Sequence, residues 1–259
     1  MRALVFEILT SYKALFTWLD KRTYFLVKIV IPFFYIAFFS YLGKFVAGAE
    51  GMKYAAFGNA ILLMGLNTVA GVVISIGIEK TFGTLSPLFI TPANRFRIFI
   101  SRAIFHAIDG TFNVMIGLVY AILFFEVELS LIQLGQILLV SLLTSFTMMG
   151  YGLLFGSYSL YVRDVGMVMN AAYFILMFIC GVNFPVESLP EYVRVLSYIV
   201  PLTYGLQVAR AILSGDYITD CIPLLIFEVL WGCVMLIIGY FLFIYFENKL
   251  RRRGTLDVI

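Results

Sequence analysis

Six long apolar blocks constrain this chain more than any other feature of its sequence. An α-helix rises about 1.5 Å per residue, so a block of twenty or more residues is long enough to cross the roughly 30 Å hydrocarbon core of a bilayer. Of the 259 residues, 62% are hydrophobic and 13% are charged, whereas soluble domains carry about 25% charged residues. The sequence therefore predicts an all-α integral membrane protein, a single domain over 1–259 with six transmembrane helices. The predicted spans are 24–46, 54–78, 98–125, 131–161, 165–184 and 221–246.

The basic residues fall unevenly on the two sides of these spans. Of the 18 lysines and arginines, fourteen lie on the side that carries both termini and the loop 78–97. The other four, on the opposite side, are Lys44, Lys53, Arg194 and Arg210. Lysine and arginine are enriched in cytoplasmic loops. We therefore expect both termini and the loop 78–97 in the cytoplasm, with the chain in the inner (cytoplasmic) cell membrane.

Residues 1–22 have an amphipathic pattern. Apolar side chains recur at helical spacing, and Arg2, Glu7 and Lys13 fall largely on the opposite face. The segment is too polar to span, so we expect a helix that lies in the membrane interface, with Trp18 at headgroup level. A helix packed on a soluble partner is the alternative.

The loop 78–97 carries two helix-start signals. Ser86-Pro87 and Thr91-Pro92 each place a hydroxyl N-cap candidate before a proline at the first helical position. Gly83 provides a flexible point just before them. This pattern predicts a short, structured helical turn, which something outside the membrane holds.

The segment 185–215 is apolar but interrupted. Pro201 divides it into halves that are each too short to cross a bilayer. Ser188 followed by Glu191 has the form of a capping box, and Gly215 is a plausible helix stop. We expect two short helices that form an external re-entrant hairpin between spans five and six, which is tolerated where it is buried in protein.

Few residue patterns are typical of catalysis. The chain has no phosphate-binding loop, and a single histidine excludes a histidine-rich metal cage. His106 and Asp109 lie three residues apart in the third span, which allows either a proton relay or ordinary inter-helix hydrogen bonding. Glu228 lies near the outer end of the last span, where we expect it to reach water.

Aromatic and amide side chains within the spans are candidates for a substrate path. The first span is dense in aromatic residues, which either line a path for an amphiphile or a glycan or simply pack against neighbours. Asparagines in spans most often form interhelical hydrogen bonds. The candidate path residues are Phe34, Tyr35, Phe38, Asn67 and Asn113.

Three stretches together resemble one family. The segment from Glu79 to Arg95, E-K-T-F-G-T-L-S-P-L-F-I-T-P-A-N-R, resembles the cytoplasmic loop of ABC-2 type exporter permeases, where an E-x-x-x-G-T-L-x-x-L-x-x-T-P-x-x-R pattern recurs. The stretches 184–192 and 201–210 are similar to the external re-entrant segment of that family. The stretch 161–165 resembles its short cytoplasmic turn before the fifth span. The three occur in the family's order across essentially the whole chain.

The resemblance implies a permease subunit without an ATPase site of its own. Two copies of a separate ABC ATP-binding subunit would bind ATP and Mg, and this chain would bind no cofactor. A second permease copy or a homologue and membrane lipid would be further partners, and no nucleic acid is implied. By the same resemblance, 1–22 is an interface helix and 79–91 a coupling helix. The implied ATPase contacts are Glu79, Lys80, Gly83, Thr84, Leu85, Pro87 and Leu88, and the implied external gate residues are Phe184, Pro185, Leu189, Pro190, Pro201 and Tyr204.

The resemblance leaves the cargo open between two branches of the family. The loop 78–97 resembles that of drug and antibiotic exporters, whereas Arg163-Asp164-Val165 and the aromatic first span are similar to polysaccharide and teichoic-acid exporters. Members of the latter branch often have Asn-Pro where this chain has Val200-Pro201. We favour export of a small amphiphile, meaning a drug, antibiotic, peptide or lipid. Export of lipid-linked polysaccharide or teichoic acid is the alternative, and a proton-coupled secondary transporter using Asp109 and His106 is an alternative of another class.

Overall fold

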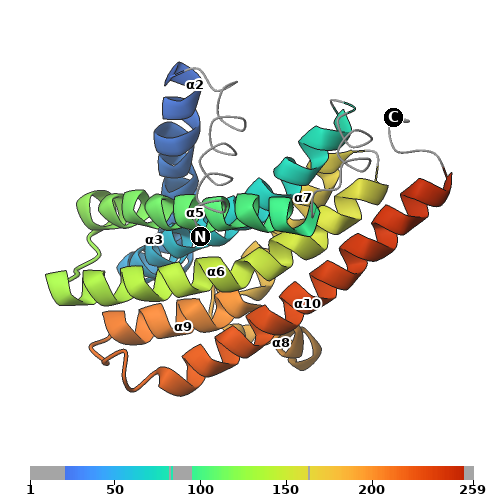
Figure 1. The fold of residues 1–259 in the computed structure, drawn as a ribbon. Coiled ribbons are helices and arrows are strands. Elements are labelled where there is room, and N and C mark those ends of the chain that lie inside the picture. Colours follow the sequence, from blue (N-terminus) through green and yellow to red (C-terminus); the bar gives the residue numbers. More distant parts are fainter. Residues whose placement is uncertain (1–20, 82, 84–94, 163, 254–259) are drawn as a thin grey trace.

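The computed structural model describes residues 21–81, 83, 95–162 and 164–253 (Figure 1). Within these ranges all regular secondary structure is helical, which confirms the predicted all-α class. The predicted interface helix 1–22 lies outside them, apart from its last two residues. The elements are α2 (Lys21–Phe25), η1 (Leu26–Val30), α3 (Ile31–Thr81), α5 (Arg95–Phe125), α6 (Leu131–Tyr161), α7 (Val165–Ile179), η2 (Val186–Ser188), α8 (Glu191–Ser197), α9 (Pro201–Leu213) and α10 (Ile222–Arg253).

The long helix α3 is broken at Ala47 and Gly48. Gly48 has φ 69° and ψ −153°, a conformation open to glycine and strained for other residues. Gly43 and Gly51 meet across the bend, because a Cβ atom on Gly43 would lie 2.3 Å from the Gly51 carbonyl oxygen. Residues eight apart in a straight helix are about 12 Å apart. The break therefore falls between the predicted spans 24–46 and 54–78 and takes two residues, and Figure 1 shows the two limbs of α3 running in different directions.

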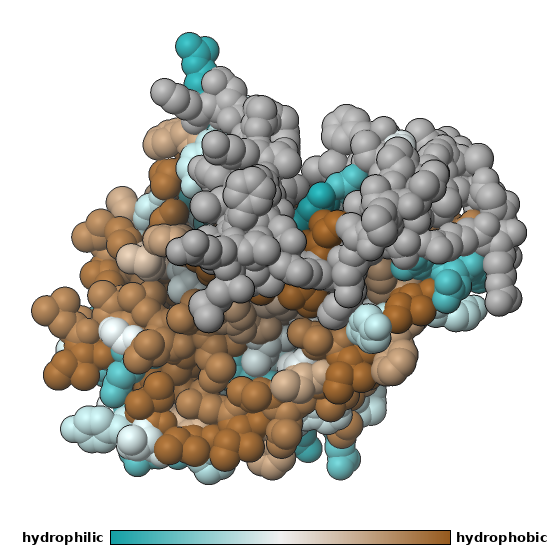
Figure 2. All heavy atoms as spheres, in the orientation of Figure 1, coloured by the Kyte–Doolittle hydropathy of each residue, from teal (hydrophilic) through white to brown (hydrophobic). Residues whose placement is uncertain are grey.

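The described residues form a membrane protein. Four helical segments are long and apolar enough to cross a bilayer, and a fifth is added if the bent pair α8–α9 counts as one span. One of the four, 22–77, runs through the break in α3. Figure 2 shows hydrophobic residues over most of the visible body. The apolar surface of the bundle is therefore suited to lipid or to another apolar partner.

The second limb of α3 lies at the centre of the bundle. It packs against α5, α6 and α7, and its residues from 55 to 65 are all buried. Glycines of the neighbouring helices allow close approach. A Cβ atom on Gly152 of α6 would lie 2.9 Å from Val72, and one on Gly117 of α5 would lie 2.9 Å from the Cα atom of Ala60. The limb that leads into the loop 78–97 is therefore held on several sides.

The two helices predicted on either side of Pro201 are present. They are α8 and α9, bent by 87° relative to each other, and Gly215, with φ 109°, follows the end of α9 as expected. The expected capping box at Ser188 was wrong, because its hydroxyl donates to the Pro185 carbonyl oxygen and α8 has no side-chain cap. The Val193 and Arg194 amides at the start of α8 donate to the Pro190 carbonyl oxygen instead.

Two predicted span boundaries also differ. Helix α7 ends at Ile179, five residues before the predicted boundary at 184, because Gly181 adopts φ 73° and begins a turn. Helix α10 continues to Arg253, so the basic residues from 249 onward belong to its last turns. Cations near a helix C-terminus interact favourably with the helix dipole, which favours this extension.

Candidate functional site

The end of α3 is joined to the start of α5 by an ion pair. Arg102 Nη2 of α5 donates to Glu79 Oε1 at 2.5 Å, and Nη1 donates to the Ser75 carbonyl oxygen at 2.9 Å. The side chains of Arg102 and Glu79 are 14% and 15% exposed. The two helices that flank the loop 78–97 are therefore fastened to each other next to the loop.

The other predicted ATPase contacts lie at or within this loop. Gly83 is exposed, has φ 65°, and has open space where a Cβ atom would stand. The backbone of Lys80 continues α3. The remaining predicted contacts lie outside the described residues; they are Thr84, Leu85, Pro87 and Leu88.

His106 of α5 forms the next contact along the α3–α5 boundary. Its Nε2 atom lies 3.0 Å from Ser75 Oγ, whose own hydrogen is donated to the Gly71 carbonyl oxygen at 2.7 Å. Ser75 Oγ therefore bridges the Gly71 carbonyl oxygen and the His106 ring. The imidazole lies flat on Gly71, where a Cβ atom would be 2.2 Å from Nδ1. Only glycine leaves room for the ring at this position.

Asp109, three residues further along α5, pairs with the first span. Lys28 Nζ in η1 donates to Asp109 Oδ2, and both side chains are largely buried. Within the described part of the chain, His106 and Asp109 share no hydrogen bond, although sequence reasoning grouped them. We call these side chains the α3–α5 polar network; its members are Glu79, Arg102, Ser75, His106, Asp109 and Lys28.

The predicted substrate-path residues do not gather in one place. Phe34 and Phe38 are each 65% exposed on the first limb of α3, and Tyr35 is partly buried there. Asn113 is buried and donates from Nδ2 to the Asp109 carbonyl oxygen at 3.1 Å. Asn67 is partly buried on the second limb of α3.

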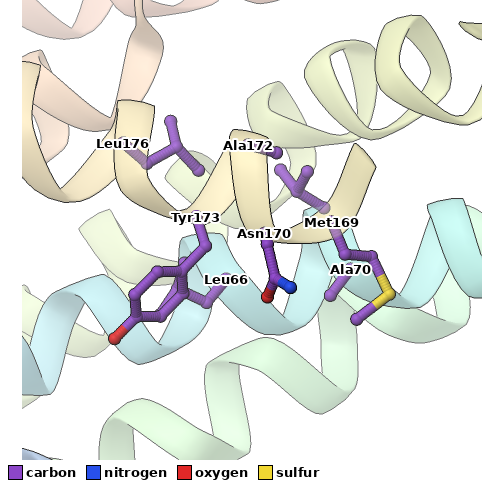
Figure 3. Close-up of a pocket in the computed structure, with 8 residues that line it drawn as sticks. Leu66, Ala70, Met169, Asn170, Ala172, Tyr173 and Leu176 are labelled. Atoms are coloured by element: carbon purple, nitrogen blue, oxygen red, sulfur yellow. The ribbon is translucent and has the colours of Figure 1, made fainter. Parts of the chain in front are cut away.

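Tyr35 connects the first limb of α3 to α7. Its ring lies edge-on to Tyr173 with centroids 5.8 Å apart. Tyr173 also lines a cavity of about 80 Å³ between α3 and α7, and Figure 3 shows Asn170 and Tyr173 projecting from α7 on the side that faces α3. Ligand pockets usually measure about 300–1,000 Å³. This cavity is therefore a packing gap too small for a drug-sized molecule.

A larger groove lies at the far end of the bundle from the loop 78–97. It measures about 590 Å³ and runs between the break in α3 and the end of α7. Two predicted gate residues, Phe184 and Pro185, line it together with Phe178. Its volume falls within the range of ligand pockets.

The other predicted gate residues lie just before α8 and at the start of α9. Leu189 is buried and Pro190 is exposed, while Pro201 is buried at the start of α9. The Tyr204 hydroxyl donates to the Tyr198 carbonyl oxygen at 2.8 Å across the turn between α8 and α9. The six candidates therefore lie on one connected segment, although only Phe184 and Pro185 line the groove.

Sequence reasoning missed the role of Arg210 on α9. Its Nη1 atom donates to Tyr54 Oη and to the Gly181 carbonyl oxygen, both at 2.6 Å, and Nη2 donates to the Val182 carbonyl oxygen at 2.8 Å. Gly58 permits this approach, because a Cβ atom there would lie 2.2 Å from the Val182 oxygen. An arginine inside an apolar run was the available signal, since such a cation needs nearby acceptors.

Glu228 differs from the expectation that it reaches water. It is fully buried on α10, and Thr147 of α6 donates to its Oε1 atom at 3.3 Å. The neighbouring helix covers it, because Gly232 of α10 packs directly on Thr147. The position of Glu228 near the end of α10 therefore did not predict its exposure to water.

These features define a helical membrane protein with buried polar contacts between its helices and an ion pair that joins the two helices flanking the loop 78–97. The sequence model of the ABC-2 type transporter family matches residues 5–214, so the chain belongs to that family. It is 26% identical over 186 residues to the probable multidrug ABC transporter permease YbhR of Escherichia coli K12 and, equally, to that of Escherichia coli O157:H7. The alignment covers 66% of this chain and 48% of each relative. The chain therefore spans about half the length of the curated relatives it matches.

Proposed function

We propose that this chain is the membrane-spanning permease subunit of an ATP-driven exporter. A separate ATP-binding subunit, present in two copies, binds ATP and Mg and moves the loop 78–97. This chain has no ATPase site and pairs with a second permease copy or a homologue. The cargo is a small amphiphile of the drug, antibiotic, peptide or lipid class. The name of the YbhR relatives, as probable multidrug permeases, supports this cargo class over polysaccharide.

The proposal includes six spans with both termini in the cytoplasm. The 51 residues of α3 are about 75 Å long at 1.5 Å per residue, more than twice the thickness of the hydrocarbon core. The break at Gly48 lets its two limbs serve as separate spans. Helices α5, α6 and α10 supply three of the other four, and the 15-residue apolar helix α7, together with the turn that follows it to Phe184, supplies the fourth. The 87° bend makes α8–α9 the re-entrant hairpin of an external gate.

The ion pair between Glu79 and Arg102 carries the proposal. A partner that moves the loop 78–97 can move spans only if the loop is rigidly attached to them. The pair joins both flanking helices beside the loop, so α3 and α5 respond to the loop as one body.

The separate partners of Asp109 and His106 argue against a proton-coupled secondary transporter. A relay requires its two groups to lie within hydrogen-bond reach, directly or through one water. Asp109 instead pairs with Lys28, and His106 is hydrogen-bonded to Ser75. Both groups have a structural use that does not require them to exchange a proton.

Co-purification with the ATP-binding subunit tests the proposal. We expect Glu79→Lys and Gly83→Pro to reduce the ATPase retained by the tagged permease by about tenfold, while both variants still insert into the membrane. Glu128→Lys is the matched control, because Glu128 is exposed in the loop before α6, at the opposite end of α5. Unchanged retention in both loop variants would refute the docking role.

A charge exchange separates direct contact from positioning. Glu79→Arg combined with Arg102→Glu restores the internal ion pair but inverts the charge that the ATPase meets. Recovery of ATPase retention indicates that Glu79 positions the loop, whereas continued loss indicates direct contact with the partner.

A further inference from the structure

The α3–α5 polar network connects the loop 78–97 to the first span. At one end, Glu79 of α3 meets Arg102 of α5, and at the other end Asp109 of α5 meets Lys28 of η1. Arg102 and Asp109 are seven residues apart, so they lie on nearly the same face of α5, about 10 Å apart along its axis. One stripe of α5 therefore carries contacts to two different spans.

The contact at Lys28 is reinforced by its neighbours. The Tyr120 hydroxyl of α5 donates to the Ile29 carbonyl oxygen at 3.0 Å, and the Phe33 ring lies edge-on to Tyr120 with centroids 5.4 Å apart. Lys28 lies in the π-helical segment Leu26–Val30, and π-helical turns occur frequently at functional sites. The first span is thus attached to α5 over about two turns that begin at Lys28.

Apolar packing alone could hold two membrane helices together. A buried ion pair requires desolvation of both groups, and apolar replacements are often as stable or more stable. Ionisable residues within spans are for this reason rare and usually functional. Lys28 is 7% exposed, so the ion pair is buried between the first span and α5. Its geometry fixes the position of one helix relative to the other in a way that apolar side chains do not.

We propose that the Lys28–Asp109 ion pair is the point at which movement of the loop 78–97 is passed to the first span. The inference rests on the proposed function, in which a partner moves that loop. The Glu79–Arg102 and Ser75–His106 contacts hold the second limb of α3 and α5 as one body, and Lys28 attaches the first span to it. Without the ion pair, the second limb of α3 and α5 still move together but the first span no longer follows. Lys28 is a positioning residue.

A distance measurement on the permease alone tests the mechanical link. Spin labels are placed on Val27→Cys in the first span and Phe241→Cys on α10, both exposed positions, with the exposed Cys233 replaced by serine. The chain is reconstituted in lipid nanodiscs, and Arg102→Gln removes the Glu79–Arg102 ion pair beside the loop 78–97. We expect the label distance to shift by about 1–2 Å, the size of helix shifts in switching transitions.

Arg102→Gln is then introduced into a variant that lacks the Lys28–Asp109 ion pair. The double variant Lys28→Met with Asp109→Asn leaves no unpaired charge and is therefore expected to fold. In this background we expect Arg102→Gln to produce no further shift. Glu128→Gln, in the exposed loop at the other end of α5, is the control and should leave the distance unchanged in both backgrounds. An equal shift in both backgrounds, or none in either, would overturn the inference.

Transport by the assembled complex separates this inference from the proposed function. With ethidium as the probe, we expect the double variant to retain the ATP-binding subunit at the normal level but to lose about tenfold in dye transported per ATP hydrolysed. The exchange Lys28→Asp with Asp109→Lys should recover at least half of that loss. No recovery in the exchanged variant, with the ATPase still retained, would contradict the role of the pair. If the unaltered chain retains no ATPase, the proposed function fails, and the nanodisc distances still decide the inference.

Discussion

Replacing Arg210 by methionine should weaken the fold at the end of α7. Methionine keeps an apolar stem of similar length but removes the donors that reach Tyr54, Gly181 and Val182. The Tyr54 hydroxyl also donates to the Gly181 carbonyl oxygen at 3.3 Å, so that oxygen keeps one partner. The Val182 carbonyl is buried and loses its donor.

The magnitude follows from these contacts. A buried acceptor left without a partner costs about 1–3 kcal/mol, and hydrogen bonds from a charged donor contribute about 1.5–3 kcal/mol each. Part of this is offset, because methionine does not require desolvation of a guanidinium. The guanidinium also lies 3.6 Å from the centroid of the Tyr54 ring, and that cation–π contact is lost too. We expect a net loss of about 2–4 kcal/mol in the free energy of unfolding.

Thermal unfolding in detergent micelles measures this loss. For a chain of this size, 1 kcal/mol corresponds to about 2–4 °C in Tm, so we expect Arg210→Met to lower Tm by about 5–15 °C. Arg210→Lys keeps the charge but lacks the planar guanidinium fork, so its Tm should lie between those of the unaltered protein and Arg210→Met. Arg194→Met on α8 is the matched control, because no side-chain hydrogen bond of Arg194 is found in the described part of the chain. A Tm for Arg210→Met equal to that of Arg194→Met would refute the reasoning.

Two glycine replacements test the helix contacts. Gly71→Ala places a methyl group against the His106 ring and should cost about 1–3 kcal/mol, measured as a fall in Tm, whereas Gly135→Ala, with open space around it, should be neutral or stabilising. A fall of equal size in both would remove the steric argument. Gly48→Ala meets no neighbour but forces alanine to φ 69°, so we expect a loss of about 1–3 kcal/mol from backbone strain alone. An unchanged Tm for Gly48→Ala would indicate that α3 is not sharply bent in solution.

The sequence predicted where helices lie better than where they end. Apolar length located the long helices because it reflects the thickness of a bilayer, and Pro201 marked the break between α8 and α9 because proline cannot continue a helix. The break at Gly48 falls between the predicted spans 24–46 and 54–78, so the sequence located it but not its length. Glycine is common in spans, and the close approach of Gly43 to Gly51 and the positive φ of Gly48 appear only in the folded structure.

The sequence did not predict which side chains pair with the charged residues. Lys28 and Asp109 are 81 positions apart in the sequence. Sequence reasoning instead paired Asp109 with His106, because the two lie three residues apart on one helix. Helical periodicity finds neighbours on one helix, whereas the pairing of helices depends on how side chains fit across several interfaces at once. Glu228 illustrates the same limit, since its burial depends on α6 and not on its place along α10.

In the proposed function, the loop 78–97 acts on several spans through helix α5. Small residues recur on it every seven positions, at Ala103, Gly110 and Gly117, and all three are buried. Small side chains allow close approach between membrane helices, and the two glycines pack directly on α3. Arg102 and Asp109 each lie one position before a member of this series, at the border of the close contact. The residues that fasten α3 to α5 and those that reach the first span therefore share one surface, so a displacement of α5 necessarily changes the environment of both.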